Sequence, residues 1–325
     1  MKLLGGAASL LLVSLSHSAA AAAPAKSATA AAPEPIALIR GTENHLLIPA
    51  TVNGKPATFL LDTGDQHCFL QKSRAEAFGV RRLGRKEHLA NRWFEAASAD
   101  ELRIGTTTFS RVEFALYDPA EFHGPVPGKN GRPADGLIGL ELLRRSKAII
   151  NCRTQQLFLQ SNPARALDLD ATTKQAGFTR IPLSLGEDGV LTVPCSIHKK
   201  PGRLVLDTGA FVTVFDQAAM RTYGVKESPS QLRARTPSGR VRSLQLAQFD
   251  DLRIGNLPIA PQKLAVMDLY ARITPVRAFL GINTIQAYDE RLVRVRRDVI
   301  GLLGSELLYE RSAIIDVGKM ALYLK

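Results

Sequence analysis

Two acidic residues in this 325-residue chain stand in the same short sequence, Asp-Thr-Gly, at Asp62–Gly64 and again at Asp207–Gly209. Each copy follows an apolar run typical of a strand covered on both faces, Phe59–Leu61 in the first and Leu204–Leu206 in the second. Two carboxyl groups held close together cannot both ionise cheaply, so such a pair holds one proton over a range of pH. Its ionised member can take a proton from water while the other donates one. The repeat therefore indicates acid–base chemistry by Asp62 and Asp207.

The sequence around the two copies repeats in the same order along the chain. Matched pairs are Ile48-Pro49 with Val193-Pro194, Glu101–Gly105 with Asp251–Gly255, Leu137–Leu143 with Leu302–Leu308, and Ala148–Asn151 with Ala313–Asp316. The spacing between partners grows from 145 to 150 and then to 165 residues, so only the loops lengthen. Such collinear repetition predicts a duplicated domain. We expect a first unit at 36–161, a linker at 162–177 and a second unit at 178–325.

The elements that must position the two aspartates are predicted to be strands. In the first unit, the extended stretches Leu46–Ile48 and Thr51-Val52 lead to Asn53-Gly54, a strong hairpin signal. The returning strand at Ala57–Leu61 delivers Asp62. The second unit repeats this order with Leu191–Val193, Ser196-Ile197, Pro201-Gly202 and a strand at Arg203–Leu206 that delivers Asp207.

A glycine and then a short helix are predicted after the strands of each unit. Gly139 precedes a helix at Leu140–Arg145, and Gly304 precedes a helix at Ser305–Glu310. Extended stretches follow at Ala148–Ile150 and Ala313–Ile315. Phe279–Gly281 is a second apolar-apolar-Gly sequence in the second unit, but only Leu302–Gly304 is followed by the same helix and strand as in the first. The pattern predicts a mainly β fold with few helices.

A polar, turn-rich stretch lies between the acid and the helix in each unit. In the second unit, Thr236–Gly239 is a tight-turn signal. Its counterpart near Lys86–Phe94 holds Trp93, the only tryptophan of the chain. These hairpins either close over a cleft, which makes Trp93, Ser238 and Gly239 candidate substrate-binding residues, or are ordinary surface loops.

These motifs resemble those of the retropepsin-like and pepsin-like aspartic peptidases. The chain looks most like an exported bacterial protein with two fused retropepsin-type units. Asp-Thr-Gly alone is a weak signal, but its duplication, with an apolar-apolar-Gly sequence following each copy at Leu137–Gly139 and Leu302–Gly304, is strong. The resemblance implies two tandem retropepsin-like β-barrel lobes with short helices, in a pseudo-two-fold bilobal arrangement with a substrate cleft between the lobes.

The resemblance also implies roles for residues of both copies. It assigns the catalytic dyad to Asp62 and Asp207, one from each lobe. It also implies three pairs of supporting residues. The Thr63 and Thr208 hydroxyls hold the two loops against each other, and Gly64 and Gly209 let the loop backbones approach closely. Gly139 and Gly304 lie in the segments that cross behind the loops. Glycine suits close approach because it has no side chain.

The resemblance implies an aspartic endopeptidase that hydrolyses peptide bonds with a water activated between the two aspartates. A peptide or protein is then the substrate, no metal or organic cofactor is needed, and a monomer suffices because both aspartates lie on one chain. Two alternatives stay open. In the first alternative, the chain is a catalytically inactive peptide-binding protein of the same fold. In the second, the units of two chains pair with each other, as in retroviral dimers.

The residue after each motif differs between the copies. Ala210 follows the second copy, as in retroviral enzymes, whereas Asp65 stands where the family usually has Ser, Thr or Ala. A third carboxylate beside the dyad would raise the pKa values of the dyad. Asp65 could instead bind a substrate amide, pair with an arginine such as Arg144, or point to solvent. Asp65 and Ala210 are therefore candidate substrate-binding residues as well.

Composition and charge limit the class of protein. The chain is 45% hydrophobic and 22% charged, as globular proteins are. Its formal net charge of +12 is strongest locally at Arg291–Arg297, but no nucleic-acid-binding signature accompanies it, so no nucleic-acid partner is expected. The three cysteines form no C-x-x-C sequence and the histidines form no H-E-x-x-H, which argues against a metal site. Either Cys68 pairs with Cys152 and leaves Cys195 free, or all three are buried thiols.

The N-terminus has the pattern of a secretory signal. A lysine at position 2, a short apolar core and an alanine-rich stretch predict a signal peptide at 1–23, followed by a flexible linker at 24–35. The apolar run is short for a membrane span, which needs about 20 apolar residues, so stable membrane insertion is not expected and an uncleaved anchor is the alternative. We expect an exported protein, periplasmic or secreted.

Overall fold

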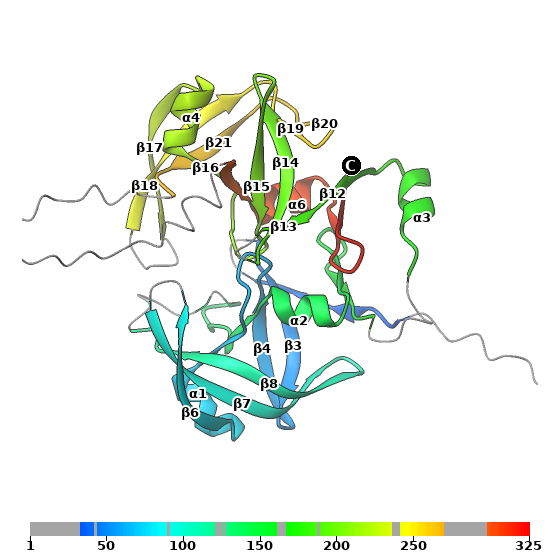
Figure 1. Cartoon of the computed structure of the whole chain (residues 1–325), viewed down its shortest axis with the longest axis vertical. Helices are drawn as coiled ribbons and strands as arrows, with labels where there is room; N and C mark the ends of the chain where they lie inside the picture. The colour runs from blue at the N-terminus through cyan, green and yellow to red at the C-terminus, as the bar shows by residue number, and fades with distance from the viewer. Residues whose placement is uncertain are drawn as a thin grey trace, which may run out of the picture. The chain divides into compact units, whose positions relative to one another are not determined.

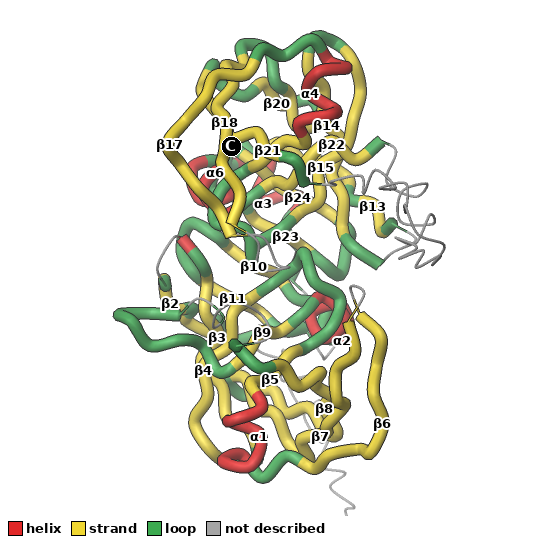
Figure 2. Tube along the Cα trace, turned by 90° about the vertical axis from the view of Figure 1, so that its left-hand side faces the viewer, coloured by secondary structure: helices red, strands yellow, loops and turns green. Residues whose placement is uncertain are grey.

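The computed structural model describes residues 33–41, 44–89, 92–120, 126, 128–160, 167–186, 189–235, 241–269 and 298–325, all within the unit Ala32–Lys325. The predicted signal segment at 1–23, most of the predicted linker at 24–35, the pair Ser238 and Gly239, and the arginine run at 291–297 lie outside these residues. Strands predominate and the helices are short, as Figure 2 shows by colour. The mainly β fold predicted from the sequence is confirmed.

The first lobe is built on an eight-stranded sheet in the order β2-β3-β4-β9-β5-β8-β7-β6. Its elements are β2 (Ile39–Arg40), β3 (Leu46–Val52), β4 (Lys55–Leu61), β5 (Phe69–Gln71), α1 (Lys72–Phe78), β6 (Arg81–Leu89), β7 (Arg92–Ile104), β8 (Thr107–Tyr117), β9 (Gly136–Ile138) and α2 (Leu140–Arg145). The predicted hairpin joins β3 to β4, which run side by side in Figure 1. Asn53 and Gly54 form its turn with φ values of 48° and 78°, the left-handed conformations that a two-residue hairpin loop needs.

The second lobe is built on a ten-stranded sheet in the order β17-β18-β21-β16-β22-β15-β14-β19-β20, with β13 paired to β14. Its elements are β13 (Ser184–Leu185), β14 (Leu191–Ile197), β15 (Lys200–Leu206), β16 (Val214–Asp216), α4 (Gln217–Tyr223), β17 (Glu227–Arg235), β18 (Val241–Phe249), β19 (Arg253–Ile254), β20 (Leu257–Pro258), β21 (Gln262–Met267), β22 (Val299–Leu303) and α6 (Ser305–Glu310). The two predicted helices, now α2 and α6, have the predicted bounds.

The second hairpin differs from the sequence prediction at its turn. Strand β15 begins at Lys200, three residues before the predicted start at Arg203, so Pro201 and Gly202 lie inside the strand. The turn is formed by His198 and Lys199, whose φ values of 51° and 62° match the first hairpin. Proline has no N–H to donate to a neighbouring strand. Pro201 is tolerated because β15 pairs with β22 only from Arg203 onward, so no hydrogen bond to β22 is lost at Pro201.

A third, six-stranded sheet takes strands from both halves in the order β1-β11-β10-β23-β24-β12. Its strands are β1 (Ile36–Ala37), β10 (Ile149–Asn151), β11 (Gln156–Phe158), β12 (Thr179–Pro182), β23 (Ile314–Asp316) and β24 (Ala321–Leu324). At its centre β10 and β23 are antiparallel, and Ile150 pairs with Ile315, its own partner in the repeat. Pairing of equivalent residues is what a local two-fold axis produces. This sheet joins the two lobes.

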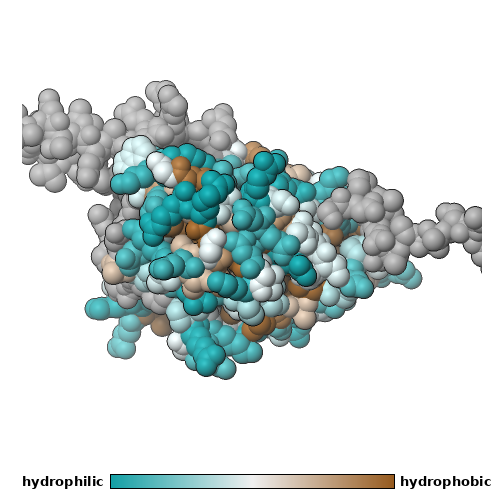
Figure 3. Space-filling view, turned by 90° about the horizontal axis from the view of Figure 1, so that it is seen from below, coloured by the Kyte–Doolittle hydropathy of each residue, from teal (hydrophilic) through white to brown (hydrophobic). Residues whose placement is uncertain are grey.

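The core consists of aliphatic and aromatic side chains from these sheets. Phe59 stacks on Phe114 in the first lobe with ring centroids 5.8 Å apart, and Phe215 stacks on Phe249 in the second at 4.5 Å. The face shown in Figure 3 is mostly hydrophilic, with hydrophobic residues in small patches. Among the described residues, the exposed large hydrophobic side chains are those of Trp93, Leu185 and Leu232.

All three cysteines are buried free thiols, so the second alternative from the sequence holds for Cys68, Cys152 and Cys195. Burial raises the pKa of each thiol to about 12. Within the described ranges, no helix has both the length and the apolar character needed to cross a bilayer.

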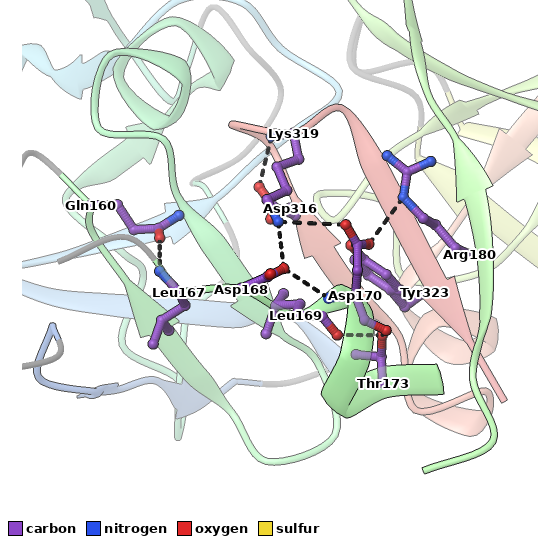
Figure 4. A network of polar contacts seen from close by, with 10 residues as sticks. All are labelled: Gln160, Leu167, Asp168, Leu169, Asp170, Thr173, Arg180, Asp316, Lys319 and Tyr323. Atoms are coloured by element: carbon purple, nitrogen blue, oxygen red, sulfur yellow. Dashed lines mark hydrogen bonds and ion pairs between the residues drawn. The ribbon is translucent and has the colours of Figure 1, made fainter. Parts of the chain in front are cut away.

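The segment that precedes the second lobe holds a short helix, α3 (Asp170–Gln175). Figure 4 shows how its start is tied to the C-terminal strand pair. The Tyr323 hydroxyl donates to Asp170 at 2.6 Å, and the Lys319 ammonium group lies 2.7 Å from Asp168. The linker predicted at 162–177 is therefore anchored, in its described part, to β24 and the turn before it.

Candidate active site

Asp62 and Asp207 stand at equivalent strand ends in the two lobes. Strand β4 runs parallel to β9 with Leu61 opposite Ile138, and β15 runs parallel to β22 with Leu206 opposite Leu303. The backbone N–H of Asp62 donates to the Ile138 carbonyl at 3.1 Å, and that of Asp207 donates to the Leu303 carbonyl at 3.0 Å. Each aspartate is thus placed where a buried strand gives way to a loop.

Gly139 and Gly304 support these loops from behind. A Cβ atom on Gly139 would lie 2.2 Å from the His67 carbonyl oxygen, and one on Gly304 would lie 2.3 Å from the Val212 carbonyl carbon. Only glycine allows this approach of backbone to backbone. Of the two apolar-apolar-Gly sequences in the second unit, Leu302–Gly304 is the one that supports the loop of Asp207. The other, Phe279–Gly281, lies outside the described residues.

The two threonines cross-link the loops. The Thr63 hydroxyl donates to the Leu206 carbonyl at 2.7 Å and accepts from the Thr208 N–H at 3.1 Å. The Thr208 hydroxyl donates to the Leu61 carbonyl at 2.8 Å and accepts from the Thr63 N–H at 3.0 Å. Both side chains are fully buried, so these bonds form without competition from water. They join the two lobes directly beneath the aspartates.

The structure brings the two carboxyl groups into contact. The side chains of Asp62 and Asp207 lie close enough for each to shift the pKa of the other, and both are partly accessible to solvent. A Cβ atom on Gly64 would lie 2.5 Å from the Asp207 carboxyl carbon, and one on Gly209 would lie 2.5 Å from the Asp62 carboxyl carbon. The absence of a side chain at both glycines is what allows each carboxyl group to sit against the opposite loop.

Backbone N–H groups hold one oxygen of each carboxyl group. Asp62 Oδ1 accepts from the N–H groups of Gly64 at 2.8 Å and Asp65 at 3.2 Å. Asp207 Oδ1 accepts from the N–H groups of Gly209 and Ala210, both at 2.9 Å. These bonds fix the orientation of both carboxyl groups before any ligand arrives.

Both carboxyl groups have a strongly raised pKa. Burial, followed by the charge of Asp65, raises the pKa of Asp62 from its ordinary value of 3.8 to about 7. Burial, followed by the charge of Asp62, raises the pKa of Asp207 to about 7, against smaller lowering effects from its backbone donors and His45. Because the two groups are coupled, the pair holds one proton between its first and second ionisation. Such a pair combines a proton acceptor and a proton donor at one point.

Asp65 lies beside this pair. Its carboxylate accepts from the His67 N–H at 2.9 Å, and burial, then partly the charge of Asp207, raises its pKa to about 6. It is half-buried, and among the described residues no arginine influences its pKa, so two of the sequence alternatives, pairing with Arg144 and full solvation, do not describe it. The third carboxylate does raise the pKa of Asp62, as expected from the sequence.

The other candidate substrate-binding residues differ in position. The Ala210 backbone is part of the site through its bond to Asp207. Trp93 lies in β7, at the hairpin with β6; its side chain is 68% exposed and its ring lies 5.0 Å from that of His88. Ser238 and Gly239 lie outside the described residues, between β17 and β18. Within the described ranges, no group of three or more His, Cys, Asp or Glu side chains is placed to hold a metal ion.

Two side chains at the site were not identified from the sequence. His45 Nε2 donates to the Gly209 carbonyl at 2.9 Å, and the Ser305 hydroxyl donates to the Thr208 carbonyl at 2.9 Å. Both are buried polar residues. A signal was present in the repeat, because the equivalent positions in the other unit are the apolar Val190 and Leu140. Such departures from a repeat mark positions where the two halves differ in function or packing.

The chain matches one protein-family model and several solved structures. The family model described as aspartyl protease matches the chain twice, at 48–142 and 193–307. No curated protein sequence matches the chain. A retropepsin-like aspartic protease from Rickettsia conorii shares 24% identity over 39% of this chain and 87% of its own, with a TM-score of 0.28.

Two larger structures align with nearly the whole chain. The aspartic proteinase from Irpex lacteus covers 90% of this chain and 97% of its own at 11% identity and a TM-score of 0.50. Basic 7S globulin from soybean covers 91% of this chain and 94% of its own at 11% identity and a TM-score of 0.51. At this identity they show the fold alone, the two-lobed β fold expected from the sequence. Because the family model matches both halves and more than half of the residues, the chain belongs to the aspartyl protease family.

Proposed function

We propose that the chain is an aspartic endopeptidase that hydrolyses peptide bonds with a water activated between Asp62 and Asp207. The observation that supports this most strongly is the direct contact of the two carboxyl groups, each with a pKa raised to about 7. One ionised oxygen takes a proton from the water, whose oxygen attacks the peptide carbonyl carbon. The protonated partner donates to the carbonyl oxygen as negative charge develops there. The reaction needs no metal or organic cofactor.

The rigidity of the site supports the same proposal. The carboxyl groups are held by four backbone N–H groups, and their loops are braced by four hydrogen bonds of the threonine pair. Groups that are fixed before the reaction do not need to reorganise during it, which lowers the barrier. A pair of aspartates that merely capped two turns would need neither the mutual contact nor the cross-bracing.

Hydrolysis of a peptide library tests the proposal. The wild type should cleave library peptides, and Asp62→Asn and Asp207→Asn should each reduce kcat by several orders of magnitude with little change in folding. Asp100→Asn is the matched control, because Asp100 is an exposed aspartate in β7. Equal activity in the wild type and both dyad variants would exclude the two-aspartate mechanism. Peptide binding without hydrolysis by the wild type would favour the alternative, an inactive peptide-binding protein.

We further propose that the chain acts as an exported monomer, with residues 1–23 as its signal and the periplasm or the exterior as its destination. Both aspartates belong to one chain and meet within it, so a second copy is not required. N-terminal sequencing of the protein from each cell fraction tests the export. Light scattering tests the monomer; activity that rises more steeply than protein concentration would contradict it.

A further inference from the structure

Two arginines from different parts of the fold lie against the ring of one tyrosine, Tyr309 of α6. The guanidinium carbon of Arg40, in β2, is 3.8 Å from the centroid of this ring. That of Arg153, in the turn between β10 and β11, is 4.5 Å from the same centroid. The two guanidinium carbons are therefore no further apart than the sum of these distances. Contact with an aromatic ring also fixes a guanidinium group in place.

These two positive charges have no carboxylate beside them in the part of the chain that the structure describes. The ion pairs found there include neither Arg40 nor Arg153, whereas Arg85 and Arg103 are each paired with glutamate. Arg40 donates to the Asn44 side-chain oxygen at 2.8 Å, and no other side-chain hydrogen bond of the two arginines is found within the described ranges. Each guanidinium group has five N–H donors, so most of their capacity is open to a ligand.

The arginine pair is accessible from solvent. Arg153 is exposed, and Arg40 and Tyr309 are half-buried. A cavity of about 10 Å³ lies beside Arg40 and Tyr309, with Ser305 among the residues that line it. This is room for no more than a single water molecule, so a larger ligand binds outside the cavity, against the arginines.

The arginine pair occurs on one side of the repeat only. The positions that match Arg40 and Arg153 in the repeat are Leu185 and Gly318, and the position that matches Tyr309 is Arg144. Both halves form the same fold although only one combination holds two arginines and a tyrosine. The shared fold therefore does not require this combination, which points to a role of its own.

We propose that Arg40, Arg153 and Tyr309 form a binding site for a phosphate group at the junction of the two lobes. The planar fork of arginine matches the oxygens of phosphate, and a terminal phosphate carries three of them around one centre. One such group can accept from both guanidinium groups at once. Its charge of nearly −2 at neutral pH also balances both arginines, which a single carboxylate does not. The ligand is inorganic phosphate, or the terminal phosphate of a soluble ester or of a lipid.

The position of this site predicts a second effect of binding. A phosphate held there connects α6 of the second lobe to β2 of the first. Ser305 lies one helical turn before Tyr309 in α6, and its hydroxyl donates to the Thr208 carbonyl in the loop that carries Asp207. A ligand that binds only the folded chain stabilises it, so phosphate should stabilise this junction. Phosphate binding would stand even if the chain hydrolysed no peptide.

Calorimetric titration of the full chain with inorganic phosphate tests the site. The titration is done at neutral pH, with chloride used to keep the ionic strength constant. The wild type should bind one phosphate per chain. Arg40→Gln and Arg153→Gln should each weaken binding about tenfold, the loss expected when one charge-assisted contact is removed. The double variant should show no binding, and the rise in thermal midpoint caused by phosphate should shrink in the same order.

Substitutions of the tyrosine separate support by the ring from the charge of the arginines. Tyr309→Phe keeps the ring and should bind phosphate nearly as well as the wild type. Tyr309→Leu removes the ring and should weaken binding, because the guanidinium groups are then no longer held in place. Arg40→Lys keeps the charge but loses the planar fork, so its affinity should lie between those of the wild type and Arg40→Gln.

Two further ligands distinguish the source of the phosphate group. Phenyl phosphate represents a soluble ester, and vesicles that contain phosphatidic acid represent a membrane, with pure phosphatidylcholine vesicles as the blank. Sedimentation with the phosphatidic acid vesicles that is lost in Arg40→Gln and Arg153→Gln would assign the site to a lipid headgroup. Binding of phenyl phosphate without binding to vesicles would assign it to a soluble ester.

The matched control is Arg103→Gln, which removes the same charge from an exposed arginine of β7 that is paired with Glu101. Its phosphate affinity should equal that of the wild type. Equal affinities of the wild type, Arg40→Gln and Arg153→Gln, or no binding by the wild type, would overturn the proposal. So would binding that appears only in Glu43→Gln, because Glu43, outside the described residues, would then already neutralise the arginines.

Discussion

Thr63 and Thr208 each complete the hydrogen bonding of the other's loop. Each hydroxyl donates to the carbonyl two residues before its partner and accepts the partner's N–H. The relationship is reciprocal because the two residues are equivalent in the repeat. It makes the lobes interdependent, since neither loop is fully hydrogen-bonded without the other.

Replacing Thr63 by valine should therefore destabilise the whole fold. Valine has nearly the same shape, but it leaves the buried Thr208 N–H and the Leu206 carbonyl without this partner, at a cost of about 3 kcal/mol in the free energy of unfolding. Urea denaturation measures the loss. Thr63→Ser is the control, because it keeps the hydroxyl and loses one methyl group, which costs about 1 kcal/mol. Equal stability of the two variants would show that the bonds contribute little.

Gly64→Ala and Gly209→Ala should separate the carboxyl groups. The new Cβ atom would lie 2.5 Å from the opposite carboxyl carbon, so one loop must move. A displacement of about 1 Å in a catalytic group is enough for a loss of roughly 100-fold in kcat.

The control for these variants is Gly79→Ala, at the end of α1. Gly79 has φ of 65° and open space around its Cβ position, so alanine strains the backbone without entering the site. It should lower the thermal midpoint and leave kcat unchanged. If Gly79→Ala reduced kcat as much as Gly64→Ala, general destabilisation rather than local geometry would be responsible.

Asp65→Ala should shift the working pH range downward. The charge of Asp65 raises the pKa of Asp62, so its removal lets Asp62 ionise at lower pH. Doubly ionised dyads then appear at lower pH, and the basic limb of the kcat/KM profile moves in the same direction. The variant copies Ala210 of the second unit, which makes it a small change to the backbone. A basic limb that stays in place would mean that Asp65 is screened from the dyad.

The dyad should make the fold less stable as pH rises. The pKa of Asp207 is 3.8 when unperturbed and about 7 in the folded protein, so the folded state binds its proton more tightly. The associated stability is complete below the unfolded value and is lost as pH rises through the folded value. Asp207→Asn removes the ionisable group and with it this loss of stability at high pH. Its thermal midpoint should exceed that of the wild type at pH 8, and the difference should shrink toward pH 4; a difference independent of pH would contradict the coupling.

Much of the fold follows from patterns that are local in the sequence. The hairpin at Asn53-Gly54 and the helices at Leu140–Arg145 and Ser305–Glu310 were predicted because turn residues and glycine boundaries act over a few positions. The start of β15 was missed because Pro201-Gly202 looks like a turn, and only the pairing with β22 shows that proline is tolerated there.

The sequence by itself determined that the chain is a duplicated, mainly β protein with one aspartate at the end of an equivalent strand in each half. The duplication makes this visible, because residues that recur at matching positions in both halves stand out from residues that do not. Only the tertiary structure decided that the carboxyl groups touch, that Asp65 is half-buried, and that His45 reaches Gly209 across 164 residues of chain. Those contacts depend on how the lobes pack, and no local pattern encodes a distance between residues so far apart in sequence.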